Sequence, residues 1–532
     1  MEIPKLDYLW QYVHYWASID SNFPFIKYKW KKYSAQQFAD AIDHLAEAFL
    51  SLGIKKGDTI VTILPMIMEY PLIYLASNSI GAICVPMDVR FRPADYRRFI
   101  PHVQPKLMFL IGKARGYDIA NTIKELSSEF NPEIKYFMIG KDEFGTPFEE
   151  LFEKKYSLNT ELKKTRSELN PDEGALIIFT GGTTGVPKAA LITHRNIAHA
   201  SYLEATYIQD KGEPLGLKPR FTMINNFPPS HAGGSIEIMG TIIAAGCEII
   251  LQEQWNPYNV LRATRKLKLQ LMGGVPTMFA ITLSLPDLDE FDLSSLKLAI
   301  LSGEKVNLEL LTGIREKICP NILNAYGSTE SGPEVTFTDV GDPLEELANG
   351  YIGKLLPEQE IKIINKDDQE LPPGEIGEML FKGTLTMSGY YNMPEENKAT
   401  FTADGWCRSG DLGYITTDGR IYIKGRKKFI IRVGSYTVLP SEVESVVVQH
   451  PKVAIAAAIG IPDKIYNEVV WLAVVPESGQ IIKEGELIEL CKKELADFKV
   501  PKRVIFEKEL PITRLGKIDR PLLQKKIIES FL

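Results

Sequence analysis

The order of apolar and polar positions along the chain predicts an α/β fold. Over residues 35–340, short apolar runs alternate with segments long enough to form helices. The runs VTIL (61–64), ICVPM (83–87), ALIIF (175–179) and KLAILSG (297–303) have the length and composition of buried strands. Such alternation predicts mostly parallel sheets covered by helices. Ligands of these sheets bind beyond the carboxyl ends of strands, so the loops that follow the runs are candidate binding sites.

The pattern changes near residue 350. Shorter alternating runs follow, punctuated by Pro-Pro-Gly at 372–374 and by Asp-Gly at 418–419, which is a strong hairpin signal. These features predict an antiparallel β subdomain. A basic run then precedes two helical patterns and the strand-like segments AIAAAIG and VVWLAVV, which predict a small α+β domain. We expect the two domains to comprise residues 1–425 and residues 426–532.

Composition and charge exclude several classes of protein. With 532 residues, of which 45% are hydrophobic and 24% charged, the chain is long enough to bury a large core. Its net charge of −7 argues against nucleic-acid binding, which needs a basic face. Five widely spaced cysteines without a C-x-x-C pair indicate neither a disulfide framework nor a zinc site.

The N-terminus and the apolar stretches favour a soluble protein. The N-terminus lacks the basic and apolar regions of a secretory signal. The longest apolar region, residues 236–251, contains Glu237 and Glu248 and is shorter than the ~20 residues that cross a bilayer. We therefore expect a cytoplasmic protein with no membrane span. The sequence leaves the oligomeric state open, with a homodimer as one option.

A loop rich in glycine and threonine follows the apolar run at 175–179. Its glycines let backbone N–H groups converge on an anion, its threonines add hydroxyl donors, and a nearby lysine supplies a cation for a polyphosphate. The loop lacks the Gly-Lys-Ser/Thr of a Walker A motif and the G-x-G-x-x-G dinucleotide pattern. A plain turn after a strand is the alternative interpretation. The candidate phosphate-binding residues are Thr180, Gly181, Gly182, Thr183, Thr184, Gly185 and Lys188.

Six motifs carry a family resemblance that spans nearly the whole chain. They are TGGTTGVPK (180–188), YGSTE (326–330), RSGD (408–411), GRKKFIIRVGSYTVLPSEVE (425–444), ADFKVPKRV (496–504) and LPITRLGKIDR (510–520). In this order and spacing they resemble the motifs of the adenylate-forming superfamily, which comprises acyl-CoA synthetases, peptide-synthetase adenylation domains and luciferases. The resemblance is strongest to the AMP-forming acyl-CoA synthetases.

The resemblance implies an ATP site. The glycine-rich loop with Lys188 would hold the β- and γ-phosphates, and Glu330 with Thr184 would bind Mg²⁺. Asp411 and Arg426 would contact the ribose. The other residues that the resemblance assigns to ATP or AMP are Ser302, Gly303, Glu304, Ala325, Tyr326, Gly327, Ser328, Thr329, Ile423 and Lys517. The alternatives are plain core packing for Tyr326, a turn-forming role for Asp411 and a helix N-terminal carboxylate for Glu330.

Two residues join Glu330 as candidate catalytic groups. Lys517 matches the family lysine that bridges the α-phosphate and the substrate carboxylate, where a flexible ammonium can follow developing charge. His231, in FPPSHAGG, matches the position near the carboxylate and the acyl entrance. An exposed loop lysine and a structural histidine are the alternatives.

The resemblance also implies that the C-terminal domain moves during the reaction. Lys428 stands two positions after the ribose arginine, where relatives have a charged hinge residue, and a surface cation is the alternative. Gly434, Ser435 and Tyr436 would form the passage for the pantetheine arm of CoA. Among the departures from the family pattern, which also include Ala189 and Phe429, Gly181 replaces a serine of the phosphate loop and Ser435 replaces a glycine of the passage. The departure at Ser435 keeps an acceptor other than CoA in view.

Together these features predict an ATP-dependent acid–CoA ligase that uses Mg²⁺. The enzyme would form an acyl-adenylate and pyrophosphate from a carboxylic acid and ATP, then transfer the acyl group to CoA and release AMP. The alternatives are an adenylation enzyme that loads a separate carrier protein and a non-catalytic nucleotide-binding scaffold. Acetate-type relatives close the acyl pocket with a tryptophan where this chain has Gly327, so we expect a larger acid, medium-chain or aromatic.

Overall fold

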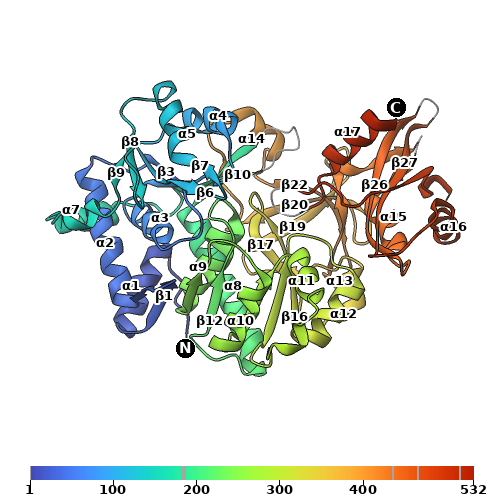
Figure 1. Ribbon diagram of the computed structural model, residues 1–532, viewed down its shortest axis with the longest axis horizontal. Coiled ribbons are helices and arrows are strands. Elements are labelled where there is room, and N and C mark those ends of the chain that lie inside the picture. Colours follow the sequence, from blue (N-terminus) through green and yellow to red (C-terminus); the bar gives the residue numbers. More distant parts are fainter. Residues whose placement is uncertain are drawn as a thin grey trace.

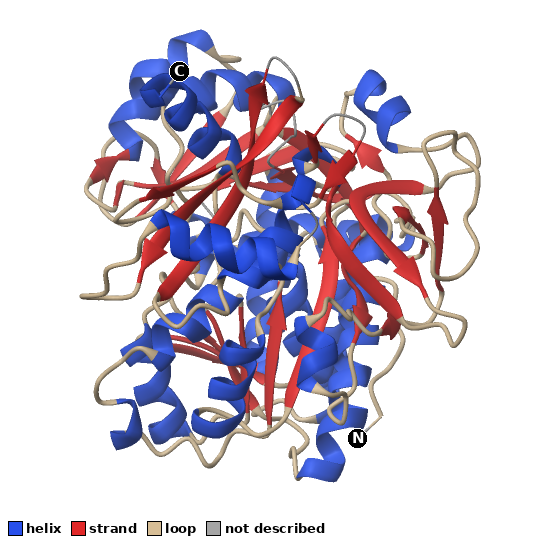
Figure 2. Cartoon of the chain, turned by 90° about the vertical axis from the view of Figure 1, so that its right-hand side faces the viewer, coloured by secondary structure: helices blue, strands red, loops and turns tan. Residues whose placement is uncertain are grey.

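The fold is that of a computed structural model, which describes residues 2–180, 187–433, 436–463, 466–495, 497–513 and 517–531. A large N-terminal part precedes a smaller C-terminal part, which is orange and red in Figure 1. Strands run through the interior of the molecule, and helices pack on their faces (Figure 2). The predicted α/β fold class is confirmed. Within the described ranges, no helix combines the length and apolarity that crossing a membrane requires.

An eight-stranded sheet forms one half of the N-terminal part. In spatial order its strands are β21 (Gly389–Tyr390), β11 (Lys188–Thr193), β10 (Gly174–Thr180), β4 (Ile83–Pro86), β3 (Thr59–Ile63), β5 (Leu107–Ile111), β8 (Lys135–Ile139) and β9 (Thr146–Pro147). From β10 to β9 all neighbours are parallel, as the alternating pattern predicted, and β11 and β21 add an antiparallel edge. The helices and short strands before and between them are α2 (Ala35–Ser51), α3 (Glu69–Ser79), α4 (Pro93–Val103), β6 (Lys113–Ala114), β7 (Tyr117–Asp118), α5 (Ile119–Leu126), α6 (Glu150–Glu153) and α7 (Asn159–Ser167).

A five-stranded sheet brings further strand ends toward the same region. Its order is β14 (Leu271–Gly274), β15 (Leu298–Ser302), β16 (Ile322–Ser328), β17 (Gly332–Phe337) and β18 (Lys354–Leu355). β14, β15 and β16 are parallel, and β17 returns antiparallel to β16. Ser302 pairs with Ala325, so the carboxyl ends of β15 and β16 lie side by side. The helices of this region are α10 (Pro257–Leu267), α11 (Pro276–Leu283), α12 (Leu308–Lys317) and α13 (Leu344–Ala348).

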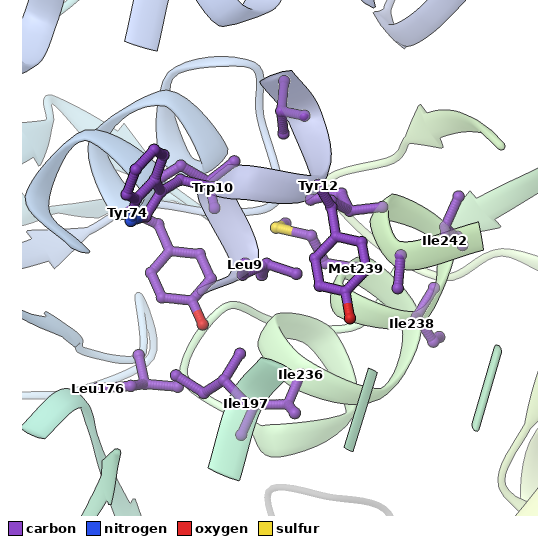
Figure 3. Close-up of a cluster of buried hydrophobic side chains, with 14 of the residues drawn as sticks. Leu9, Trp10, Tyr12, Tyr74, Leu176, Ile197, Ile236, Ile238, Met239 and Ile242 are labelled. Carbon is purple, nitrogen blue, oxygen red and sulfur yellow. The ribbon is translucent and has the colours of Figure 1, made fainter. Parts of the chain in front are cut away.

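A large hydrophobic core lies between the first sheet and a four-stranded sheet of β12 (Thr222–Asn225), β13 (Glu248–Leu251), β1 (Pro24–Tyr28) and β2 (Lys31–Ser34). It is built from α1 (Leu9–Ile19), α8 (His194–Gly212), the π-helix η3 (Gly233–Ile238) and α9 (Met239–Ala245), with side chains such as Tyr12, Ile236 and Met239 drawn in Figure 3. The indole N–H of Trp16 in α1 donates to the carbonyl of Ala244 in α9 at 3.1 Å. Burying each large side chain contributes ~1.5–3 kcal/mol, so this core holds α8 and η3 firmly in place.

The predicted antiparallel subdomain is a sheet of β19 (Gln359–Ile364), β20 (Gly377–Gly383), β22 (Cys407–Ile415) and β23 (Ile421–Arg426). Between β20 and β22 the chain forms β21 of the first sheet and then α14 (Pro394–Thr400). The predicted hairpin turn joins β22 to β23, and Gly419 supplies the left-handed residue of that turn with φ +82°. The turn thereby brings the RSGD motif of β22 opposite the end of β23.

The C-terminal part has its own sheet and its own hydrophobic clusters. Its strands are β25 (Tyr436–Val438), β24 (Ile431–Val433), β27 (Asn467–Pro476) and β26 (Val453–Asp463) in that order, with β28 (Arg503–Phe506) parallel to β27. α15 (Pro440–Val447) and α16 (Glu484–Glu494) contribute to one cluster, and α17 (Arg520–Phe531) contributes to another. The segments AIAAAIG and VVWLAVV lie in β26 and β27, as predicted.

Candidate active site

A cavity of about 940 Å³ opens where strand ends from both large sheets meet. Residues at the carboxyl ends of three strands line it: Thr180 at the end of β10, Ser302 and Gly303 at the end of β15, and Gly327, Ser328 and Thr329 at the end of β16. The carboxyl-end rule for parallel sheets therefore locates this cavity correctly.

Asp411 and Arg426 form an ion pair because they lie opposite each other in the β22–β23 hairpin. Arg426 Nε lies 2.6 Å from Asp411 Oδ1, and the hydroxyl of Tyr326 donates to Asp411 Oδ2 at 2.7 Å. Asp411 is only 1% exposed, and this burial raises the pKa of its carboxyl although both partners favour the charged form. Arg426 lines the cavity, so a buried carboxylate with two donors stands directly behind the cavity wall. Tyr326 thus does more than pack in the core.

Glu330 lies in the turn between β16 and β17, so a helix N-terminal role for this carboxylate is wrong. The hydroxyl of Thr180 donates to Glu330 Oε1 at 2.9 Å, and the hydroxyl of Tyr390 donates to the same oxygen at 3.0 Å. Lys188 Nζ stands 4.8 Å from the centre of the Tyr390 ring. Glu330 lines the cavity. Carboxylate and hydroxyl oxygens are the ligands that Mg²⁺ prefers, so Glu330 and Thr180 fit such an ion.

Lys517 reaches from the C-terminal part of the chain to the cavity. Its ammonium donates to the carbonyl of Gly303, a residue with φ +92°, where glycine is favoured. Burial lowers the pKa of Lys517, an effect that the carboxylate of Glu304 opposes and the guanidinium of Arg426 reinforces. Lys517 is therefore a cavity residue and not an exposed loop lysine.

His231 lines the same cavity just before η3. Its Nδ1 lies 3.1 Å from the backbone N–H of Gly233, which donates to it. Burial, together with the positive charges of Lys517 and Arg90, lowers the pKa of His231 to about 4. The ring is therefore neutral at physiological pH, with Nδ1 as acceptor and Nε2–H as donor.

Three glutamates without a predicted role also line the cavity: Glu204 from α8, Glu237 from η3 and Glu334 from β17. Burial raises the pKa of Glu237 to about 7 and those of Glu204 and Glu334 well above their ordinary values. The described residues contain no group of three or more His, Cys, Asp or Glu arranged to hold a metal ion. In the sequence, the only signal for these glutamates is that each is a single charge inside an otherwise apolar segment, as in SIEI and PEVTF.

The remaining predicted residues divide into two groups. Gly181, Gly182, Thr183, Thr184, Gly185, Gly434 and Ser435, and the side chains of Lys428 and Tyr436, lie outside the part of the chain that the structure describes. Among the described candidates, Ala325 is buried in β16, and Ile423 packs against the main core at the edge of β23. The charge of Glu304 raises the pKa of Lys517, which lines the cavity.

Comparisons with known proteins agree with the motifs over most of the chain. The family model described as "AMP-binding enzyme" matches residues 13–391, and the model described as "AMP-binding enzyme C-terminal domain" matches residues 442–517. The Bacillus subtilis protein YdaB is 31% identical over 493 residues, which cover 92% of this chain and 93% of YdaB. A long-chain-fatty-acid–CoA ligase of Bacillus subtilis is 29% identical over 507 residues, which cover 91% of this chain and 87% of the ligase.

A solved structure also shares the fold. ATP-bound MatB from Rhodopseudomonas palustris superposes with a TM-score of 0.82 at 23% identity, covering 98% of this chain and 100% of MatB. At this identity the likeness supports the architecture of the chain and not its substrate.

Proposed function

The chain belongs to the family of AMP-binding enzymes, and from that premise we propose that it is an ATP-dependent acid–CoA ligase. One observation carries the proposal: three kinds of group meet at one cavity. They are an ammonium, a guanidinium that pairs with a buried carboxylate, and a carboxylate that lies next to a hydroxyl. These groups belong to Lys517, Arg426 and Glu330, and they come from three different parts of the fold. Joining a carboxylate to a nucleotide phosphate requires such groups, because both reactants and the leaving group are anionic.

In the first half-reaction, a carboxylate oxygen of the acid attacks the α-phosphorus of ATP, and the bond from that phosphorus to the bridging oxygen of pyrophosphate breaks. We assign Lys517 to the charge that develops between the two reactants, since its ammonium already lies at the cavity and needs only to exchange its bond to Gly303. Asp411 would accept hydrogen bonds from the ribose hydroxyls, with Arg426 and Tyr326 holding the carboxylate in place.

The polyphosphate would lie along the loop after β10, near Lys188. Glu330 and Thr184 would hold Mg²⁺, with the hydroxyl of Thr180 beside Glu330 as a further oxygen, and the ion when bound would neutralise charge on the phosphate oxygens. The neutral ring of His231 can donate from Nε2 to the carboxylate of the acid, which would orient it for attack.

In the second half-reaction, the sulfur of CoA attacks the acyl carbon and AMP leaves. Lys517 and the thiol need the same approach to that carbon, so we propose that the C-terminal domain, residues 426–532, turns about Lys428 between the steps. The turn would withdraw Lys517 and bring Gly434, Ser435 and Tyr436 to the cavity as the pantetheine passage.

We propose that the acid is larger than acetate, of medium length or aromatic. The cavity offers about 940 Å³ to the nucleotide and the acyl group together. A Cβ built on Gly327 would lie 2.0 Å from the carbonyl oxygen of Pro333, so this backbone leaves no room for a tryptophan there. We also propose a cytoplasmic location, because the five cysteines are free and buried, as is usual in a reducing compartment.

The test is acid-dependent ATP–pyrophosphate exchange, followed by AMP release with and without CoA. We expect exchange with acids of six or more carbons to exceed exchange with acetate, and AMP release to require CoA. Failure of every acid to support exchange would reject the proposed function. A preference for acetate would reject only the size of the acid, and turnover with a carrier-protein thiol but not with CoA would favour the alternative acceptor.

A further inference from the structure

Tyr390 contacts two residues of the proposed phosphate and metal site, although no motif assigned it a role. It belongs to the edge strand β21 and is only 6% exposed. Its hydroxyl donates to Glu330 Oε1 at 3.0 Å, and Lys188 Nζ lies 4.8 Å from the centre of its ring. Lys188 is the first residue of β11, and Glu330 stands in the turn between β16 and β17. One side chain therefore contacts a cation and a carboxylate that belong to two different sheets.

The position of Tyr390 is set by contacts other than those with the two charged residues. Its backbone N–H donates to Asn397 Oδ1 at 2.6 Å, and Asn397 Nδ2 donates to its carbonyl at 2.9 Å. On its other side β21 pairs with β11, where Ala190 lies opposite Tyr390. Ala190 and Met387 also belong to a small hydrophobic cluster with Tyr390. The ring thus has a defined place against which a charged neighbour can be held.

Glu330 accepts both of its hydroxyl donors at the same oxygen. Thr180 donates to Oε1 at 2.9 Å beside Tyr390, whereas Oε2 accepts no hydrogen bond from the described residues. Burial raises the pKa of Tyr390, and the charge of Glu330 is the next largest cause, so the phenol keeps its proton and remains a donor. Two donors on one oxygen orient the carboxylate and leave its other oxygen for a ligand.

Lys188 and Glu330 do not pair with each other although both contact Tyr390. The structure describes both residues, and it shows no salt bridge between them and none from Lys188 to any other described carboxylate. The face of a tyrosine ring attracts an ammonium at this distance, which gives Lys188 a partner that leaves its charge intact. A direct salt bridge would instead neutralise the cation that a phosphate needs and the carboxylate that a metal ion needs.

We infer that Tyr390 is a positioning residue for the phosphate and metal site: its hydroxyl fixes the orientation of the Glu330 carboxylate, and its ring holds the ammonium of Lys188 away from that carboxylate. The inference rests on the proposed function and adds a residue to its site. The competing interpretation is that Tyr390 only fills the small hydrophobic cluster at the sheet edge. The two interpretations differ measurably, because packing needs the ring but not the hydroxyl.

The test is calorimetric titration of ATP into the full-length enzyme without acid, so that no turnover occurs, once with excess Mg²⁺ and once with EDTA. Tyr390→Phe keeps the ring and removes the donor. Loss of a hydrogen bond that orients a metal ligand typically costs about 10–100-fold in metal affinity. We therefore expect Tyr390→Phe to weaken binding of Mg·ATP by at least ~tenfold and binding of metal-free ATP by less than about threefold. Unchanged binding of Mg·ATP, or equal weakening with and without Mg²⁺, would overturn the inference.

A second variant, Tyr390→Leu, removes the ring as well as the hydroxyl. Lys188 then loses the ring face, so we expect metal-free ATP to bind Tyr390→Leu at least about threefold more weakly than Tyr390→Phe. Equal binding of metal-free ATP by the two variants would reject the role of the ring. Tyr390→Phe retains the packing of the ring and is expected to fold, so the inference stays testable even if Tyr390→Leu does not fold.

Tyr391→Phe is the matched control, because it makes the same chemical change at the next residue. The hydroxyl of Tyr391 forms no hydrogen bond with the part of the chain that the structure describes, so both ATP affinities should stay unchanged. A loss of Mg·ATP affinity in Tyr391→Phe equal to that in Tyr390→Phe would show that the effect is not specific to the bond with Glu330, and would overturn the inference.

A double-mutant cycle shows whether Tyr390 acts through Glu330. In the Glu330→Gln background the metal-binding carboxylate is already lost, so adding Tyr390→Phe should weaken Mg·ATP binding by less than about threefold further. A further loss of about tenfold would mean that the hydroxyl acts on something other than Glu330, and would reject the role of Tyr390 as its positioning residue.

These binding measurements also separate the inference from the proposed function. If no acid supports pyrophosphate exchange but Tyr390→Phe selectively weakens binding of Mg·ATP, the ligase function fails and the role of Tyr390 stands. If exchange occurs and Tyr390→Phe binds Mg·ATP like the unmutated enzyme, the ligase function stands and the inference fails. Absence of ATP binding by the unmutated protein would reject both.

Discussion

Replacing Lys517 by alanine should separate the two half-reactions. The ammonium of Lys517 lies at the cavity, bonded to the carbonyl of Gly303, and in the proposed mechanism it is needed only while charge develops at the α-phosphorus. Removing a single preorganised donor to a developing negative charge costs about 10²–10³ in rate. We therefore expect Lys517→Ala to slow adenylate formation by about 10²–10³, equivalent to ~2.7–4 kcal/mol of barrier. Transfer from a supplied acyl-adenylate to CoA should change by less than about threefold, because the proposed turn of the C-terminal domain withdraws the lysine before this step.

Rapid-quench single-turnover assays measure both steps, with adenylate formation from ATP and acid in one and thioester formation from supplied adenylate in the other. Lys508→Ala is the control, since Lys508 is exposed in the same C-terminal part and should leave both rates unchanged. Equal losses in both half-reactions, in a protein that is still folded by circular dichroism, would refute the assignment of Lys517 to one step.

The remaining predictions concern the proposed hinge, the proposed ribose site and the buried carboxyl of Glu237. Proline at Lys428 would fix φ near −65° and hinder the turn, so Lys428→Pro should impair thioester formation at least ~tenfold more than adenylation, and equal small effects on the two single-turnover rates would reject the hinge. Tyr326→Phe removes one donor from the Asp411 carboxylate, and since a hydrogen bond to a charged group is worth ~1.5–3 kcal/mol, the KM for ATP should rise about tenfold or more, whereas an unchanged KM would mean that Tyr326 only packs. The pKa of Glu237 is raised to about 7 from its ordinary value of 4.5, so the stability that its bound proton provides is fully present below pH 4.5 and lost as pH rises through about 7. The Tm of Glu237→Gln relative to the unmutated protein should therefore be higher at pH 8.5 than at pH 5, and equal Tm differences at both pH values would contradict the raised pKa.

The pairing of Asp411 with Arg426 shows how much of the site the sequence alone could predict. The Asp418-Gly419 turn predicts a hairpin, and counting outward from that turn brings Asp411 close to the end of the second strand. The pairing of Ile415 with Ile421 and of Gly413 with Ile423 would then put Asp411 opposite Gly425. Instead Asp411 pairs with Arg426, because the register shifts by one residue between Leu412 and Gly413.

That one-residue shift is a β-bulge, and it decides which side chain faces the carboxylate. Gly413 permits the bulge, since a Cβ there would lie 2.4 Å from the carbonyl oxygen of Tyr422. The sequence predicted that Asp411 and Arg426 each contact the ribose but not that the two side chains pair with each other, and periodicity alone would put Gly425 opposite Asp411. The ion pair at 2.6 Å is therefore a consequence of local backbone geometry that only the folded hairpin reveals.

The three cavity glutamates, Glu204, Glu237 and Glu334, could not be predicted as neighbours from the sequence, for a different reason. Each of these glutamates interrupts an apolar segment. A helix or strand with one polar face shows the same pattern, so the interruption does not by itself indicate a site. Glu237 was therefore interpreted only as an interruption that argues against a membrane span. The three glutamates come together because the core around Trp16 and Met239 fixes α8 and η3. The turn after β16 then brings β17 back beside these two helices. This convergence depends on packing between elements that are distant in sequence, so the placement of three carboxyl groups on one cavity emerges only in the folded chain.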